Sequence, residues 1–236
     1  MARTPIWQSI AASVEAEIGA GHYRAGDKLP TEAALAARFG VNRHTVRRAL
    51  GDLAERGLVR ARRGAGVFVA ATPTLYPIGK RTRFHQNIRA SGRLPHRRVL
   101  RIETRPSDNA EAKALGLMEG APVVVYEGLS LAEDVPMALF ESLFPAERLP
   151  DLAATLAEVS SITEALRRNG IDDYLRAHTR VSAERATPTQ ALHLGLREGD
   201  PLLRTTALNT TPEGAPLEYG RTWFAGDRVT LTVTPE

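Results

Sequence analysis

"TEAALAARFGVNRHTVRRAL", residues 31–50, predicts two short helices that are joined by a tight turn. Thr31 is a favourable N-cap for the first helix, and Leu35 lies on its apolar face. Gly40 suits the left-handed position at which helices commonly end, and Asn42 caps the helix that follows. Two helices connected by a short glycine-containing turn form a helix-turn-helix, so we expect this motif here.

The second of these helices combines an apolar stripe with a cluster of basic side chains. At 100° per residue, Arg43 and Arg47 flank the stripe, while His44 and Arg48 lie near the opposite pole. Recognition helices present residues of their first turns to base edges, where the helix N-terminus also favours anions. The stripe consists of Val46, Ala49, Leu50 and Leu53, and the predicted DNA contacts are Arg43, His44, Thr45, Arg47 and Arg48. A solvated basic face is the alternative interpretation.

A hairpin is expected directly after this helix. The stretch "LVRARRGAGVFVA" (58–70) alternates apolar and polar residues and has two glycines near its middle, which is typical of two strands with a turn. A basic hairpin after a helix-turn-helix is a wing, which can contact phosphate or enter the minor groove. The predicted contacts of this wing are Arg62, Arg63, Gly64 and Gly66.

The composition predicts a folded protein without disulfide chemistry. Hydrophobic residues make up 43% of the 236 residues, and the chain has no cysteine. No apolar run approaches the roughly 20 residues of a membrane helix, so we expect a cytoplasmic protein with no membrane partner. The six histidines lack metal-ligand spacing, and no nucleophile elbow or phosphate loop is present. We therefore expect no metal, no cofactor and no catalytic residue.

Charge is distributed unevenly along the chain. Residues 1–70 hold 11 Lys and Arg against 6 Asp and Glu, and residues 80–105 hold 9 against Glu103 alone. Residues 106–236 hold 11 against 20, so the net charges are +5, +8 and −9. A basic first half and an acidic second half predict different partners, with a polyanion for the first.

The rest of the chain contains an internal duplication. "LGLMEGAPVVV" (115–125) matches "LGLREGDPLLR" (194–204) at an offset of 79 residues. Each copy follows an alternating stretch and a short helical one, and each precedes a strand, a turn with proline and another strand. Two such units predict one α+β domain with an antiparallel sheet and helices on one face. The uncharged segment 71–79 predicts a linker between a domain over 1–70 and a domain over 80–236.

Residues 6–70 resemble the winged-helix domain of GntR-family bacterial transcription regulators. The resemblance implies contacts from Arg43 and Arg47 to base edges and from Thr31 to phosphate, although Ala33 replaces an arginine that is common in the family. The remainder is similar to the effector-binding (UTRA) domain of the HutC branch, which has the chorismate-lyase fold. The segment "YPIGKRTRF" (76–84) resembles the phosphonate-metabolism regulators of that branch, the PhnF-like proteins.

An anionic effector needs arginine forks, hydroxyls and free amides, and several stretches offer them. The resemblance places ligand contacts at or near Phe84, Ser161 and Tyr219, and Ser160 or Ser161 caps a predicted helix. The full predicted effector set is Arg81, Thr82, Arg83, Phe84, Ser161, Glu218, Tyr219 and Arg221. Gly128, Ser130 and Phe140 replace charged residues of sugar-phosphate-sensing relatives, which argues against a sugar phosphate. DNA contact by Arg81 and Arg83, and purely structural roles for Ser161, Tyr219 and Arg221, remain alternatives.

The leading hypothesis is a homodimeric repressor that binds double-stranded operator DNA and responds to a small anionic effector, a phosphonate or phosphate ester. One alternative is the same class of regulator with a different metabolite, such as a sugar phosphate or a histidine-pathway acid. Two others are a DNA-tethered enzyme and an architectural DNA-binding protein without a ligand.

Overall fold

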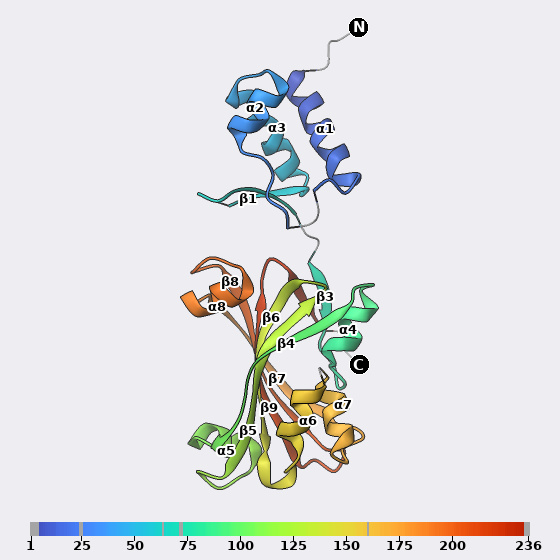
Figure 1. The fold of residues 1–236 in the computed structure, drawn as a ribbon, viewed down its shortest axis with the longest axis vertical. Coiled ribbons are helices and arrows are strands. Elements are labelled where there is room, and N and C mark those ends of the chain that lie inside the picture. The colour runs from blue at the N-terminus through green and yellow to red at the C-terminus, as the bar shows by residue number, and fades with distance from the viewer. Residues whose placement is uncertain (1–4, 24–25, 63, 71–72, 160, 234–236) are drawn as a thin grey trace. The chain divides into compact units, whose positions relative to one another are not determined.

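The chain folds into two compact units, Met1–Thr72 and Pro73–Glu236 (Figure 1). A computed structural model describes residues 5–23, 26–62, 64–70, 73–159 and 161–233. The linker predicted over 71–79 is shorter than expected, because residues 74–77 form strand β3 (Thr74–Pro77), which pairs in parallel with β10 (Val229–Thr232). The side chains of β3 are alternately buried and exposed, so this strand belongs to the core of the second unit.

The first unit has the predicted helix-turn-helix. Thr31 accepts a hydrogen bond from the Ala34 amide, and Asn42 accepts one from the Thr45 amide, so both predicted N-caps are present. The apolar stripe of the second helix is buried, with Val46, Ala49 and Leu53 fully enclosed. The helices are α1 (Ile6–Gly19), α2 (Glu32–Phe39) and α3 (Arg43–Glu55).

The predicted wing is also present. Strands β1 (Val59–Arg62) and β2 (Gly66–Val69) pair antiparallel, with Arg62 opposite Gly66. Gly66 has a φ of 114°, a backbone conformation that favours glycine over residues with a side chain. Arg63 lies outside the described residues.

The second unit is built on a six-stranded antiparallel sheet in the order β4-β5-β6-β9-β8-β7. The two repeats supply β4-α5-β5-β6 and β7-α8-β8-β9, and they meet at the central β6–β9 pair. Gly116 and Gly195, equivalent in the repeats, end α5 and α8 in the left-handed region with φ of 65° and 61°. The strands are β4 (Pro95–Pro106), β5 (Pro122–Ala132), β6 (Val135–Pro145), β7 (Leu175–Arg185), β8 (Pro201–Thr210) and β9 (Pro216–Ala225).

Helices cover both faces of this sheet, which corrects the prediction of helices on one face (Figure 1). One face packs against α5 (Asn109–Leu115) and α8 (Pro188–Leu194). The physical reason is that β5 and β6 are apolar on both sides, so each side must be covered. The other face carries α4 (Phe84–Ala90), the 3-10 turn η1 (Ala146–Arg148), α6 (Leu152–Glu158), α7 (Ile162–Arg168) and the β3–β10 pair.

Candidate nucleic-acid interface and ligand cavity

The basic side chains at the start of α3 are exposed and differ in their partners. Arg47 forms a bidentate ion pair with Glu32, with Nε–Oε1 and Nη2–Oε2 distances of 3.0 and 2.7 Å. The guanidinium of Arg48 lies 4.7 Å from the ring centroid of Trp7. Arg43, by contrast, forms no hydrogen bond or ion pair with the described residues, so its fork is free to contact a nucleic acid.

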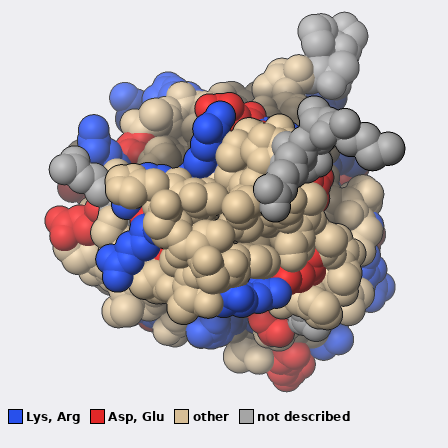
Figure 2. Space-filling model, turned by 90° about the horizontal axis from the view of Figure 1, so that it is seen from above, with Lys and Arg blue, Asp and Glu red and all other residues tan. Residues whose placement is uncertain are grey.

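The other predicted contacts in this unit have local structural roles. The Thr45 hydroxyl donates to Asn42 Oδ1 at 3.0 Å, and the Thr31 hydroxyl caps α2. His44 is exposed on the first turn of α3. Figure 2 shows Lys and Arg side chains in separate small groups around a largely uncharged surface, with Asp and Glu interspersed.

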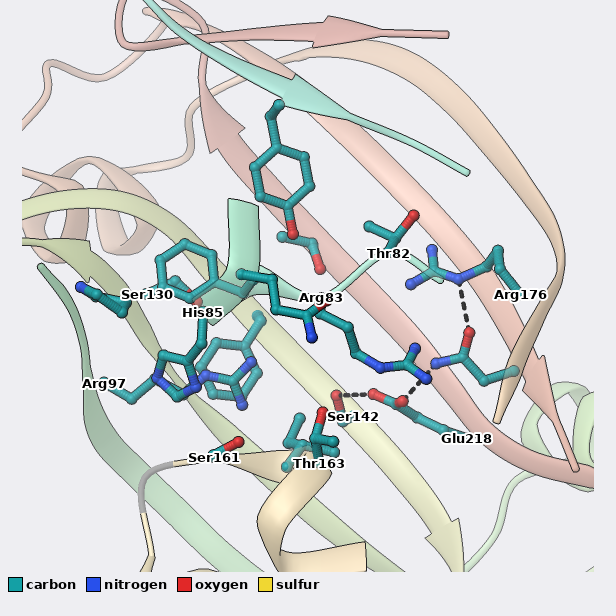
Figure 3. A pocket seen from close by; sticks show the side chains of 18 of the residues that line it. Thr82, Arg83, His85, Arg97, Ser130, Ser142, Ser161, Thr163, Arg176 and Glu218 are labelled. Atoms are coloured by element: carbon teal, nitrogen blue, oxygen red, sulfur yellow. Dashed lines mark hydrogen bonds between the residues drawn. The ribbon is translucent and has the colours of Figure 1, made fainter. Parts of the chain in front are cut away.

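The second unit encloses a cavity of about 490 Å³ between the sheet and the helices α4 and α7 (Figure 3). Its lining is rich in hydrogen-bonding groups from several elements. Five of the eight predicted effector residues line it, namely Thr82, Arg83, Phe84, Ser161 and, on β9, Glu218. The Ser161 hydroxyl accepts a bond from the Glu164 amide as the N-cap of α7, as predicted, and Ser160 lies outside the described residues.

Several contacts hold the Arg83 side chain in this cavity. It precedes α4 as the N-cap residue, and its side chain is only 8% exposed. Its Nη2 donates to the Tyr174 carbonyl oxygen at 2.7 Å and to Asp173 Oδ1 at 3.3 Å, and its guanidinium lies 3.4 Å from the centroid of the Tyr174 ring. The other terminal nitrogen, Nη1, is buried without a partner among the described residues. A buried donor without an acceptor is unfavourable, so Nη1 is positioned for an acceptor that the chain itself does not supply.

Arg97 of β4 is a second arginine of the cavity, and it was not among the predicted effector residues. Its Nε and Nη1 atoms are buried and lack partners among the described residues, and its guanidinium lies 4.6 Å from the Phe140 ring centroid. It faces Ser130 across the β4–β5 ladder. Its position in the basic run 80–105 was a signal, but only the sheet pairing reveals which of those side chains enters the cavity.

His85 adds a neutral imidazole to the same lining. Burial, followed by the nearby charges of Arg97, Arg89 and His96, lowers its pKa to about 4. It is therefore uncharged near pH 7, and the positive charge at this end of the cavity comes from arginine.

A hydrogen-bond chain crosses the sheet at the other end of the cavity. Glu218 is 7% exposed and accepts bonds from Ser142 Oγ and from Asn209 Nδ2, both at 2.6 Å. Asn209 Oδ1 in turn accepts a bond from Arg176 Nε at 2.6 Å. In Figure 3, Ser142, Glu218 and Arg176 lie on the opposite side of Arg83 from Arg97 and Ser130. Nearby, Thr163 Oγ1 and the Tyr174 hydroxyl lie 2.9 Å apart in a hydrogen bond.

Three predicted effector residues lie outside the cavity, which corrects the sequence analysis. Arg81 is exposed and pairs with Asp173, with Nη2–Oδ2 at 2.6 Å, so it does not form a clamp with Arg83 inside the cavity. Tyr219 and Arg221 share a face of β9, but it is the face opposite to the cavity. The reason is the alternation of side chains along a strand, since Glu218 points into the cavity.

Among the described residues, no group of His, Cys, Asp and Glu is arranged to hold a metal ion. None of the described helices combines the length and apolar composition needed to cross a bilayer.

Comparison with known proteins gives matches to both units. A family model described as "UTRA domain" matches residues 90–230, and one described as "Bacterial regulatory proteins, gntR family" matches residues 7–69. The chain is 37% identical over 229 residues to the probable transcriptional regulator PhnF of Escherichia coli strain K12, covering 96% of this chain and 94% of that protein.

Two further comparisons concern mycobacterial proteins. The transcriptional repressor PhnF of Mycolicibacterium smegmatis is 29% identical, with coverage of 89% of this chain and 84% of that protein. The crystal structure of PhnF from Mycobacterium smegmatis superposes with a TM-score of 0.68 at 27% identity, covering 96% of this chain and 99% of that one.

Proposed function

Because the chain belongs to the GntR family of bacterial transcription regulators that carry a UTRA domain, we propose that it is a repressor controlled by a small anion. In this proposal the first unit binds operator DNA, and the cavity of the second unit binds a phosphonate or a phosphate ester. The matched families are regulators, so the alternative of a DNA-tethered enzyme is set aside.

The observation that carries the effector proposal is the pair of incompletely bonded arginines. Arg83 Nη1 and Arg97 Nε and Nη1 are buried donors without partners among the described residues, and both arginines line the same cavity. Arginine forks bind phosphonate and phosphate oxygens through charge-assisted hydrogen bonds, which are about twice as strong as neutral ones. An anion in this cavity would satisfy these donors, and Ser130, Ser161 and Thr163 offer hydroxyls beside them.

The repressor proposal rests on the family and on the chain's connectivity. The Mycolicibacterium smegmatis relative is named a transcriptional repressor. Arg83 follows β3 by only six residues, and β3 is the first strand after the boundary between the units. A ligand that moves Arg83 therefore acts on the segment that leads to the DNA-binding unit.

We further propose that the regulator acts as a homodimer. Two recognition helices would then contact half-sites that lie about 34 Å apart, one turn of DNA. An effector that favours a dimer with a different spacing lowers operator affinity, and a typical coupling of about 1–3 kcal/mol changes occupancy about 5–150-fold.

The direct test is fluorescence anisotropy on labelled DNA from upstream of the gene for this protein, at fixed salt concentration. We expect alkylphosphonates or phosphate monoesters to release the DNA, whereas sugar phosphates and histidine-pathway acids do not. Tight operator binding that no member of the panel changes would contradict the effector proposal and leave the DNA-binding role intact.

The Arg43→Ala variant is expected to lose about 1–3 kcal/mol of operator affinity and to tolerate base changes at the position it contacts. The reason is that Arg43 has a free fork at the start of α3, where a bidentate contact to guanine is possible. Competition binding with single-base operator variants measures the loss of selectivity.

Arg56→Ala is the matched control for this experiment. It removes the same charge at the opposite end of α3, where Arg56 pairs with Glu15 and Asp52. An equal loss of affinity for both variants, without a change in base selectivity, would contradict a base contact by Arg43.

A further inference from the structure

The cavity contains a buried carboxylate as well as arginines. Glu218 forms no ion pair with the described residues, and its hydrogen-bond partners Ser142 and Asn209 are both neutral. A buried charge that is balanced only by neutral donors is unfavourable, so Glu218 favours a cation beside it. Arg176 does not supply that contact, because it reaches Glu218 only through the Asn209 side chain.

Glu218 also has the capacity to accept more hydrogen bonds. A carboxylate offers about four acceptor positions on its two oxygens. Here each oxygen accepts one bond, from Ser142 Oγ to Oε1 and from Asn209 Nδ2 to Oε2. A primary ammonium group carries three donors and matches this unfilled capacity.

The buried carboxylate and Arg97 lie at separate ends of the same space, and Arg176 lies at the carboxylate end without contacting it directly. Arg97 lies on one side and Glu218 on the other, with Arg83 between them (Figure 3). All three residues line the cavity, so one small molecule can contact all of them. An anion without a positive group would leave Glu218 without a direct ion-pair partner and place a second negative charge in its neighbourhood.

We propose that the effector is a small zwitterion, with a phosphonate or phosphate head at Arg83 and Arg97 and an ammonium group at Glu218. This inference rests on the proposed function and narrows its ligand class. Glu218 is then the residue that selects amino-substituted anions over plain ones, while the two arginines provide the affinity that both kinds of ligand share.

The test compares ligands that differ only in the positive group. The first pair is 2-aminoethylphosphonate and propylphosphonate, in which a methyl group replaces the ammonium group. The second pair is O-phosphoethanolamine and propyl phosphate, which separates phosphate esters from phosphonates as the source of the head group. Calorimetric titration of the full-length protein with each compound gives the affinities, and operator release by the same compounds is measured in parallel.

The amino compound of at least one pair is expected to bind at least about ten-fold more tightly than its partner. In Glu218→Gln this preference should fall to within about two-fold, while the affinity for the alkyl compound is kept or increased. Glu198→Gln, at an exposed position away from the cavity lining, is the matched control and should keep the full preference.

The outcomes separate this inference from the function on which it rests. If amino and alkyl compounds bind the unmodified protein equally and release the operator, the proposal of a zwitterionic effector is wrong. The proposal of an anionic effector is then still supported. If no compound binds, both proposals are wrong. If a folded Glu218→Gln protein loses affinity for the amino and the alkyl compound to the same extent, Glu218 has a structural role and does not select between the ligands.

Discussion

The Arg83→Met variant is expected to keep operator affinity within about two-fold and to lose effector-dependent release. Arg83 directs an unpaired donor into the cavity, and a hydrogen bond to a charged group contributes about 1.5–3 kcal/mol, so effector affinity should fall at least about ten-fold. Methionine keeps much of the buried stem volume and leaves no unpaired charge. The measurement is effector titration by calorimetry, together with operator release by anisotropy.

Arg81→Met is the matched control for Arg83. Both residues belong to the segment between β3 and α4, and both pair with Asp173, but only Arg83 lines the cavity. A normal effector response in Arg81→Met beside a lost response in Arg83→Met supports a direct contact. Loss of the effector response in both variants would show that the effect comes from the ion pairs with Asp173. Loss of operator binding in Arg83→Met alone would show that Arg83 contributes to DNA binding.

The helix-turn-helix could be predicted from sequence because its signals are local. The N-caps Thr31 and Asn42 and the glycine at position 40 lie within twelve residues of one another, and each acts on its own helix terminus. The six-stranded sheet could be predicted from the sequence for a different reason. The repeat at an offset of 79 residues duplicates a whole strand–helix–hairpin unit, so two copies predict two halves of one sheet.

The cavity residues were harder to predict because they depend on which face of the sheet is enclosed. The alternation along β9 places Tyr219 and Arg221 together, but nothing local indicates that the cavity lies on the side of Glu218. The cavity position of Arg97 was hard to predict for the same reason, since Arg97 is one of several arginines on an edge strand with mostly exposed side chains. The face is set by tertiary contacts, namely the packing of α6 and α7 on Tyr126 and Phe140.

Arg221 and Glu111 show what the opposite face of β9 does instead. The Glu111 carboxylate is 2% exposed and binds Arg105 through two hydrogen bonds of 2.7 and 2.8 Å and Arg221 through one of 2.9 Å. It also accepts a bond from the Asp108 amide at the start of α5. One carboxylate thus joins α5 to strands β4 and β9.

Glu111→Ala is expected to destabilise the second unit by about 3–5 kcal/mol at pH 7, the usual result of removing one partner of a buried ion pair. Chemical denaturation of the full-length protein measures this change. Glu119→Ala is the control, because this nearby glutamate is exposed and accepts one long bond from Asn109. Its loss should change stability by less than about 0.5 kcal/mol.

The stabilisation by Glu111 should also depend on pH in a defined direction. Hydrogen bonds from Arg105, with the Asp108 amide and the charge of Arg221, lower the pKa of Glu111 from 4.5 to about 2. In the unfolded chain the carboxylate regains its usual pKa, so the unfolded state binds the proton first as the pH falls. The contribution of the ionised Glu111 carboxylate to the free energy of unfolding is therefore fully present above pH 4.5 and is lost as the pH falls from 4.5 to 2. The stability difference between the unmodified protein and Glu111→Gln should shrink over this range, and a difference that stays constant down to pH 3 would contradict a charge-based role for Glu111.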